Sequence, residues 1–287
     1  LAYGNAALGH GLRHVLRSRI ARGAIGDEAV RHQGVPANHL KRLWAEGRCA
    51  LGVFATIPSV EVIQILAATG LDFVLIDMEH APIGPAEASR MIAATNGTGL
   101  TPLVRVPALS AQAAKAPLDF GAMGICFPFV STPADAETAV RAVRYPPDGD
   151  RGWGPFYAPM RWDLSMRAYQ DAADAEILTM ATLESPAALE TLDAILATPG
   201  LDCACLGLGD LATALGHRGR VDHPQVRAAA ARMERAARDT PVALGGAAAS
   251  AEEANAMIAR GYRLLSLGFD WALLQRGIEG AVAGVAR

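Results

Sequence analysis

Lysine is nearly missing from this chain. Among the 287 residues there are two lysines, Lys41 and Lys115. Schiff-base chemistry on a carbonyl compound needs a lysine whose amine is made nucleophilic by desolvation or a neighbouring cation. Lys41 precedes the strand-like part of the chain and Lys115 falls within a helical pattern. We therefore expect any carbonyl chemistry here to rely on a metal ion to stabilise negative charge.

Other scarcities exclude whole classes of partner. The net charge is −3 with no block of lysine and arginine, so we expect no nucleic acid and no anionic membrane as partner. Apolar runs are too short for a membrane-spanning helix, and residues 1–26 lack the apolar core of a signal peptide. The 4 cysteines lie in apolar stretches and do not form a disulfide framework. These features predict a cytoplasmic protein.

Short apolar runs typical of buried strands alternate with longer amphipathic runs typical of helices. Strands that are apolar throughout indicate a parallel sheet covered on both faces, so the pattern predicts an α/β fold, a (β/α)8 TIM barrel. An open doubly wound sheet is the alternative, but the glycine-rich first turn typical of that fold is missing after the first strand. The predicted strands are 50–57, 72–79, 102–107, 124–130, 177–184, 203–209, 242–248 and 264–270.

The sequence predicts two regions. Residues 1–47 form a helical extension, which we expect to pack over the N-terminal end of the barrel or against another subunit, and residues 48–287 form the catalytic barrel. Residues 144–176 are too long for an ordinary connection between a helix and a strand. We interpret them as a long functional loop.

Charged residues gather where the predicted strands end, and in such barrels the chemistry lies at the C-terminal ends of the strands. The segment "LIDMEHAP" runs from a buried strand into Asp77, Glu79 and His80. Later strands carry or end in Arg105, Glu184, Asp210 and Asp270. We expect these acids, the imidazole and the guanidinium to converge on one mouth of the barrel.

Glu184 and Asp210 are predicted to end neighbouring strands. Two carboxylates so close repel each other unless one is protonated or a cation lies between them. Oxygen ligands suit a hard divalent ion such as Mg²⁺ or Mn²⁺. The alternative is that Glu184 only caps the helix that begins at Pro186 and that Asp210 only caps the short turn "LATALG".

Arg105 and His80 are the candidates for substrate binding and proton transfer. Arg105 interrupts an apolar strand, and its guanidinium suits a substrate carboxylate, although a structural salt bridge with one of the acids is the alternative. His80 follows Asp77 by three positions and suits a catalytic base, against the commoner role of a buried structural histidine.

Three weaker signals remain. Cys203 and Cys205 share one face of a strand and are interpreted as small core residues. His10 and His14 have the spacing of a zinc pair on a helix but lack a third ligand nearby. Gly245 with Gly246 would let the backbone approach a phosphate, which is the weak basis for a phosphate-binding isomerase.

The motifs together resemble those of the HpcH/HpaI family, the class II pyruvate aldolases, and the extension resembles the branch that includes macrophomate synthase. The resemblance covers about residues 47–280 and rests on "FVLIDMEHAP", "VRVP", "LDFGAMGICFPFV", "RYPPDGDRGWG", "LESPAALE" and "GLGDLA". Two positions depart from the family pattern: Thr182 replaces a common glutamine, and Leu208 replaces the proline of "GPxD".

The resemblance implies a set of roles. Glu184 and Asp210 would hold the metal, either Mg²⁺ or Mn²⁺, with Co²⁺ as a further candidate. His80 would move protons, positioned by Asp77 and Asp119. Arg105 would steady the enolate, and Thr182, Gly209 and Asp210 would contact the substrate. The resemblance also implies a homotrimer or homohexamer that exchanges the last helix, so that Asp119 serves a neighbour's site.

The predicted function is therefore a metal-dependent lyase acting through a pyruvate enolate. Its substrates would be a 2-oxo acid, pyruvate or oxaloacetate, and an aldehyde or other acceptor. One alternative is a macrophomate synthase-like enzyme that forms C–C bonds after decarboxylation. Another is a barrel without turnover that only binds a metal and a 2-oxo acid, which the departure at Thr182 motivates.

Overall fold

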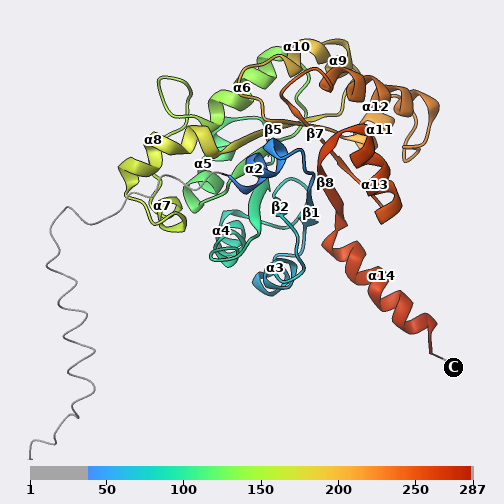
Figure 1. Ribbon diagram of the computed structural model, residues 1–287, viewed down its shortest axis with the longest axis horizontal. Coiled ribbons are helices and arrows are strands. Elements are labelled where there is room, and N and C mark those ends of the chain that lie inside the picture. Colours follow the sequence, from blue (N-terminus) through green and yellow to red (C-terminus); the bar gives the residue numbers. More distant parts are fainter. Residues whose placement is uncertain (1–37, 286–287) are drawn as a thin grey trace, which may run out of the picture. The chain divides into compact units, whose positions relative to one another are not determined.

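Eight parallel strands close into a barrel in chain order (Figure 1). The computed structural model describes residues 38–285, and every predicted strand is present in it. The predicted (β/α)8 barrel is thereby confirmed. The strands are β1 (Ala50–Ala55), β2 (Phe73–Asp77), β3 (Thr101–Arg105), β4 (Gly124–Phe127), β5 (Leu178–Leu183), β6 (Cys203–Leu206), β7 (Ala243–Ala247) and β8 (Tyr262–Phe269).

The helices surround the barrel, and several begin at a hydroxyl cap as expected. Thr132 and Ser185 accept hydrogen bonds from the first turns of α6 and α9, each with proline at the next position. The helices are α2 (His39–Ala45), α3 (Val60–Ala67), α4 (Pro85–Ala94), α5 (Ala111–Phe120), α6 (Pro133–Val143), α7 (Ala158–Arg161), α8 (Met166–Glu176), α9 (Pro186–Glu190), α10 (Leu192–Leu196), α11 (Leu208–Ala214), α12 (Pro224–Ala237), α13 (Ala251–Arg260) and α14 (Asp270–Ala283).

One prediction about the connections between the strands was wrong. The stretch 144–176 is not a single long loop, because α7 and α8 lie within it. Its proline- and glycine-rich beginning hid the later amphipathic turns. The stretch after Ser185 forms two short helices, since Thr191 leaves helical geometry with φ −106° and ψ 17°.

Side chains alternate between the inside of the barrel and the surrounding helices, and this alternation positions the site. On β2, Phe73 and Leu75 belong to the inner apolar cluster, whereas Val74 and Ile76 belong to the cluster beneath the helices. The next inward position is Asp77. The same period of two makes Arg105 the last inward residue of β3.

The helix α2 closes the N-terminal end of the barrel. Leu40 and Leu43 are 0% and 2% exposed and join the inner apolar cluster. Asn38 donates from Nδ2 to the carbonyls of Met123 (3.0 Å) and Glu176 (2.8 Å). Residues 38–47 of the predicted extension therefore pack on the barrel, while residues 1–37, with His10 and His14, lie outside the described residues.

The last helix, α14, extends away from the barrel (Figure 1). Its apolar side chains are uncovered: Leu274 is 58%, Ile278 is 55% and Val282 is 45% exposed. Burial of such a face is favourable, so α14 has the character of a contact surface. Across residues 38–285, no helix is both long and apolar enough to span a membrane.

Candidate active site

A cavity of about 700 Å³ opens at the C-terminal ends of the strands. The predicted site residues Asp77, His80, Arg105, Thr182, Glu184, Gly209 and Asp210 all line it. Because α2 closes the opposite end of the barrel, this mouth is where substrates meet the inward-facing polar side chains. The expected convergence at one rim is thus observed for these residues.

Asp77 and Arg105 form a two-point ion pair. Their strands place them side by side as Cα partners in the β2–β3 ladder. Arg105 donates from Nε to Asp77 Oδ1 (3.0 Å) and from Nη2 to Asp77 Oδ2 (2.7 Å). Neither bond uses Nη1. Asp77 is 1% exposed, so this carboxylate needs its partner. The salt bridge that was the alternative for Arg105 is thus observed, and binding of a substrate carboxylate by Arg105 stays a prediction.

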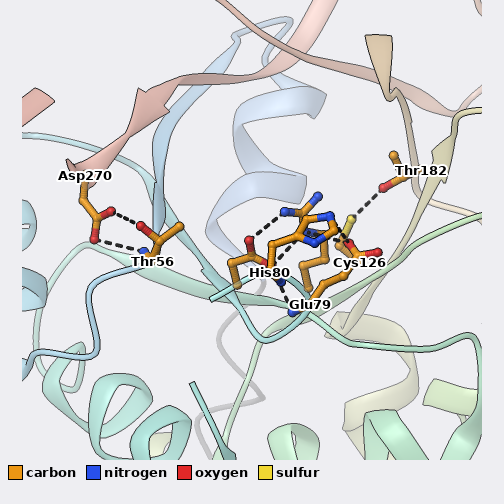
Figure 2. A network of polar contacts seen from close by, with 8 residues as sticks. Thr56, Glu79, His80, Cys126, Thr182 and Asp270 are labelled. Atoms are coloured by element: carbon orange, nitrogen blue, oxygen red, sulfur yellow. Dashed lines mark hydrogen bonds and ion pairs between the residues drawn. The ribbon is translucent and has the colours of Figure 1, made fainter. Parts of the chain in front are cut away.

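His80 and Glu79 belong to the turn after β2 and not to the strand. The His80 side chain is 62% exposed, and its Nε2 lies 3.7 Å from Glu79 Oε2 (Figure 2). Asp77 Oδ1 accepts from the backbone nitrogens of Glu79 (3.0 Å) and His80 (3.3 Å). Asp77 therefore fixes the turn that presents the imidazole to the cavity, rather than contacting the ring.

Glu79 is held between opposite charges. Its Oε2 lies 3.2 Å from Arg105 Nε. Burial raises its pKa, Arg105 and His80 act to lower it, and Asp77 and Asp210 act to raise it. Glu79 is thus electrostatically linked to Asp210.

Glu184 is the most perturbed acid of the site. It is 5% exposed, and burial raises its pKa to about 7, with Asp210 and Glu79 adding to the effect. Oε1 accepts from the backbone nitrogen of Phe129 at 2.7 Å. Phe129 has φ 53°, a conformation uncommon for a bulky residue, and that turn brings its N–H to the carboxylate.

A glycine makes room for the other oxygen of Glu184. A Cβ at Gly207 would lie 2.5 Å from Glu184 Oε2. Any side chain at this position would push the carboxylate aside, so the backbone of residue 207 forms part of the cradle that holds it. Ser185, not Glu184, caps α9, which removes the capping alternative for Glu184.

Asp210 does not end a strand, contrary to the prediction. β6 stops at Leu206, and Asp210 lies in the first turn of α11, where Gly207 occupies the cap position. The run "GLGD" was read as strand because it is apolar and follows β6 directly. Its acidic side chain is exposed at the mouth and acts on the pKa values of both Glu184 and Glu79.

The donor set fits a hard divalent ion that keeps several positions for water and substrate. Within residues 38–285 no group of three or more His, Cys, Asp or Glu side chains forms a closed metal site. Asp210 disfavours the ionised form of Glu184, and a cation between the two carboxylates would relieve this repulsion. Carboxylate oxygen is the ligand type that Mg²⁺ and Mn²⁺ prefer.

Thiols line the floor of the cavity beside Thr182. Cys126 Sγ lies 3.3 Å from Thr182 Oγ1 (Figure 2), and Cys203 Sγ lies 4.0 Å from Cys205 Sγ. Cys203 is fully buried, as expected of a core residue. Gly245 is needed for this packing, because a Cβ there would lie 2.3 Å from Cys205 Sγ.

Asp119 lies apart from the cavity. It belongs to α5 and lines a separate hollow with Lys115 and Trp153. Its Oδ1 lies 3.8 Å from Nη2 of the buried Arg151, and burial raises the pKa of Asp119. Within this chain, the structure does not bring Asp119 to His80.

The last polar residue of the rim, Asp270, is used structurally. Its carboxylate accepts from the backbone nitrogens of Thr56 (3.0 Å) and Ile57 (2.9 Å) and from Thr56 Oγ1 (2.6 Å) (Figure 2). It thereby ties the end of β8 to the loop after β1. The role of Asp270 is to hold the barrel seam.

The sequence interpretation missed three aromatic residues of the cavity, Phe54, Phe269 and Trp271. Phe54 follows the same inward alternation on β1 as Asp77 does on β2, so counting by twos from Ala50 would have found it. Phe269 and Trp271 flank the start of α14, and no local signal distinguishes them from ordinary strand and helix residues.

Comparisons with known proteins agree with one another. The model of the HpcH/HpaI aldolase/citrate lyase family matches residues 50–276. The hydroxypyruvate/pyruvate aldolase of Paraburkholderia phytofirmans is 34% identical over 254 residues, covering 86% of this chain and 97% of that protein.

Two solved structures share the fold over most of their length. An HpcH/HpaI aldolase/citrate lyase family protein from Burkholderia cenocepacia superposes with a TM-score of 0.80 at 34% identity, covering 85% of this chain and 97% of that one. Macrophomate synthase gives a TM-score of 0.77 at 29% identity, covering 85% and 87%. These likenesses extend over the barrel and its mouth.

Proposed function

This chain belongs to the HpcH/HpaI aldolase/citrate lyase family, and on that premise we propose that it makes and breaks carbon–carbon bonds through the enolate of pyruvate. In the synthetic direction, C3 of the enolate forms a bond to an aldehyde carbon, and the aldehyde oxygen takes a proton. In oxaloacetate the C3–C4 bond breaks, CO₂ leaves, and the remaining electron pair forms the same enolate. The observation that carries the proposal is the meeting of Glu184, Asp210, Arg105 and His80 at one cavity.

Glu184 and Asp210 would hold the divalent metal, Mg²⁺ or Mn²⁺, with Co²⁺ as a substitute. When bound, such an ion acts as a Lewis acid that stabilises the negative charge of the enolate. Thr182 and Gly209 line the cavity beside these acids and would contact the 2-oxo acid. Thr182 is shorter than the glutamine common at this position in the family, so its contact with the substrate is correspondingly weaker.

Arg105 would bind the enolate oxygen or the carboxylate of the substrate. Asp77 occupies Nε and Nη2, so the guanidinium is held in a fixed orientation with Nη1 available. A group fixed before the reaction stabilises developing charge without reorganising. This is the advantage of the buried pair over a flexible lysine.

His80 would move the protons. Aldol cleavage requires removal of a proton from the 4-hydroxyl of the substrate, and the exposed imidazole at the mouth can reach it. Asp77 holds the backbone of the same turn. Asp119 would assist His80 from a neighbouring copy, which is consistent with its separation from the cavity of its own chain.

A homotrimer or homohexamer would bring such a copy into place. The uncovered apolar face of α14 supports assembly, because an isolated helix with exposed leucine, isoleucine and valine is stabilised by burial against another surface. Exchange of α14 between copies would provide that burial.

The deciding experiment measures pyruvate release from oxaloacetate above the background of free metal. We expect turnover that exhaustive EDTA treatment abolishes and that Mg²⁺, Mn²⁺ or Co²⁺ restores. Activity that survives EDTA would overturn the metal assignment. A complete lack of turnover, with metal-dependent binding of oxalate retained in a thermal-shift titration, would instead favour the barrel that only binds.

A decarboxylating enzyme like macrophomate synthase is the second candidate, supported by the structural likeness over 85% of this chain. It would use the enolate only after loss of CO₂. If C–C bond formation occurs with oxaloacetate but not with pyruvate as donor, this candidate is the correct one.

A further inference from the structure

The cavity has an aromatic wall, defined here as Phe54, Phe269 and Trp271. The rings of Phe54 and Phe269 lie 5.0 Å apart between centroids, and those of Phe269 and Trp271 lie 6.4 Å apart. At its inner end, the Arg105 guanidinium lies 4.9 Å from the centre of the Phe54 ring. The wall therefore runs from the group proposed to bind the enolate to the outer surface.

The aromatic wall lies on β1, the end of β8 and the start of α14, which carry none of the residues proposed to bind the metal or the 2-oxo acid. The proposed metal ligands follow β5 and β6, and the Asp77–Arg105 pair ends β2 and β3. Apart from β4, which contributes Cys126 between these groups, the closed order of strands leaves β7, β8 and β1 as one continuous free sector. An aldehyde must place its carbonyl beside the enolate, so its remaining substituent extends along this sector.

Polar groups in the free sector are already engaged. Thr56 Oγ1 donates to Asp270, and Ser266 Oγ donates to the carbonyl of Gly268 (3.0 Å). β7 contributes only Gly246 and Ala247 to the lining. A polyhydroxylated acceptor would find few free donors here, and unpaired hydroxyls are costly to desolvate.

Positive charge is equally scarce. Among the described residues that line the cavity, Arg105 is the single arginine or lysine, and Asp77 and Glu79 already face it. An acceptor that carries a phosphate or a second carboxylate would find no arginine or lysine in this lining other than the already paired Arg105. Such acceptors are disfavoured.

Open aromatic surface, in contrast, is available. Phe269 is 36% and Trp271 is 51% exposed. Flat apolar groups stack on such rings, and the contact adds to the gain from burying apolar area. Pro82, in the loop after β2, and Leu208, at the start of α11, supply further apolar lining.

We propose that the acceptor is an aldehyde bearing a flat apolar substituent, an aryl aldehyde, whose ring packs against Phe269 and Trp271. This inference rests on the proposed aldolase function and names the acceptor class for the same site. The step is an addition without a leaving group: C3 of pyruvate loses a proton and bonds to the aldehyde carbon, and the aldehyde oxygen gains a proton. The product is a 4-aryl-4-hydroxy-2-oxobutanoate.

The test compares two acceptors with pyruvate as donor on the metal-loaded full chain. We expect kcat/KM for benzaldehyde to exceed that for glyceraldehyde by about tenfold or more, the scale of one good aromatic contact. Trp271→Ala should reduce this ratio about tenfold, whereas Trp271→Phe, which keeps an aromatic face, should retain most of it. Because kcat/KM for both acceptors is measured on the same preparation, the concentration of folded enzyme cancels in their ratio.

Ile65→Ala is the control, because Ile65 is similarly exposed (63%) but lies on α3 and does not line the cavity. Its ratio should equal that of the parent. A parent that prefers glyceraldehyde or does not react with benzaldehyde overturns the inference, as does an unchanged ratio in Trp271→Ala. Decarboxylation of oxaloacetate, which uses no acceptor, separates this failure from failure of the aldolase function itself.

Discussion

Asp210 helps to disfavour the ionised state of Glu184, and a cation held between the two carboxylates would relieve this effect. Glu184→Gln and Asp210→Asn each remove one charged ligand, so we expect each to weaken Mn²⁺ binding by at least about tenfold. Calorimetric titration or the spin-resonance signal of free Mn²⁺ measures this directly. Asp193→Asn, an acidic position on α10 outside the cavity, serves as control. Parent-like affinity in both ligand variants would disprove the assignment.

The raised pKa of Glu184 gives metal binding a pH dependence. Its folded-state pKa of about 7 exceeds the ordinary 4.5, so ionisation is disfavoured in the folded, metal-free protein. Stability of the metal-free protein should therefore fall as pH rises from 4.5 to about 7 and level off above. Metal affinity should rise over the same range, because the ion must displace a proton, and it should change by up to about tenfold per pH unit.

Thermal unfolding between pH 5 and pH 8, with and without Mn²⁺, tests both trends. Glu184→Gln cannot ionise and should lose this part of the pH dependence. If the variant and the parent have the same pH profile, another group is responsible.

Variants of His80 and Arg105 should distinguish the requirements of aldol cleavage from those of decarboxylation. Decarboxylation generates the enolate by loss of CO₂ and needs no base to begin, whereas aldol cleavage must remove a hydroxyl proton. His80→Ala should therefore slow aldol cleavage by about 10²–10⁴-fold and decarboxylation far less. Arg105→Ala should slow both, because both pass through the enolate.

Arg105→Ala leaves Asp77 buried without its partner, which typically destabilises a protein by about 3–5 kcal/mol. Its rates are therefore compared with those of Arg105→Lys, which keeps the charge, at a temperature where both are folded. Equal losses of the two activities in His80→Ala would mean that the imidazole only supports the site.

At the scale of elements, α2 acts as a plug for the barrel. Leu40 is fully buried in the inner cluster, so Leu40→Ala should lower the free energy of unfolding by about 2–5 kcal/mol. Arg42 is exposed and lies two residues further along α2. Arg42→Ala should change the free energy of unfolding by less than about 0.5 kcal/mol. Urea unfolding followed by circular dichroism measures both. Similar stabilities for the two variants would show that α2 does not contribute to the core.

Strands could be predicted from the sequence because all of them show the same pattern, a short run of apolar residues. The strands are apolar on both faces because each lies between the inner cluster and the helices, and that property is visible in a single sequence. α11 was missed because its first residues, "LGD", continue the apolar run of β6. The predicted rim residues were found because strand ends in a barrel meet at one mouth.

Pairings between elements could not be predicted in the same way. The Asp77–Arg105 pair depends on the β2–β3 register, and Phe54 meets Phe269 only when the barrel closes. A single sequence shows which residues are present, but it does not show which of them are brought into contact when the barrel closes.

At the scale of the whole molecule, α14 should control assembly. Leu274 and Ile278 are the centre of its uncovered face, so Leu274→Asp with Ile278→Asp should dissociate an oligomer built on this helix. Light scattering coupled to size exclusion measures the mass. Glu279→Gln, a change at a polar position of the same helix, should leave it unchanged. An oligomer that survives the double substitution would show that copies meet elsewhere.

The seam between β8 and β1 has a consequence for synthesis of the protein. Asp270 binds the loop at Thr56 across 214 positions, and Trp44 Nε1 donates to the carbonyl of Arg263 across 219 positions. At translation rates of about 5–20 residues per second, on the order of 10 s or more separates the synthesis of these partners. During that interval the nascent chain holds β1 without its β8 neighbour, as an open strand edge that invites chaperone binding. Closure becomes possible only after β8 has left the ribosome.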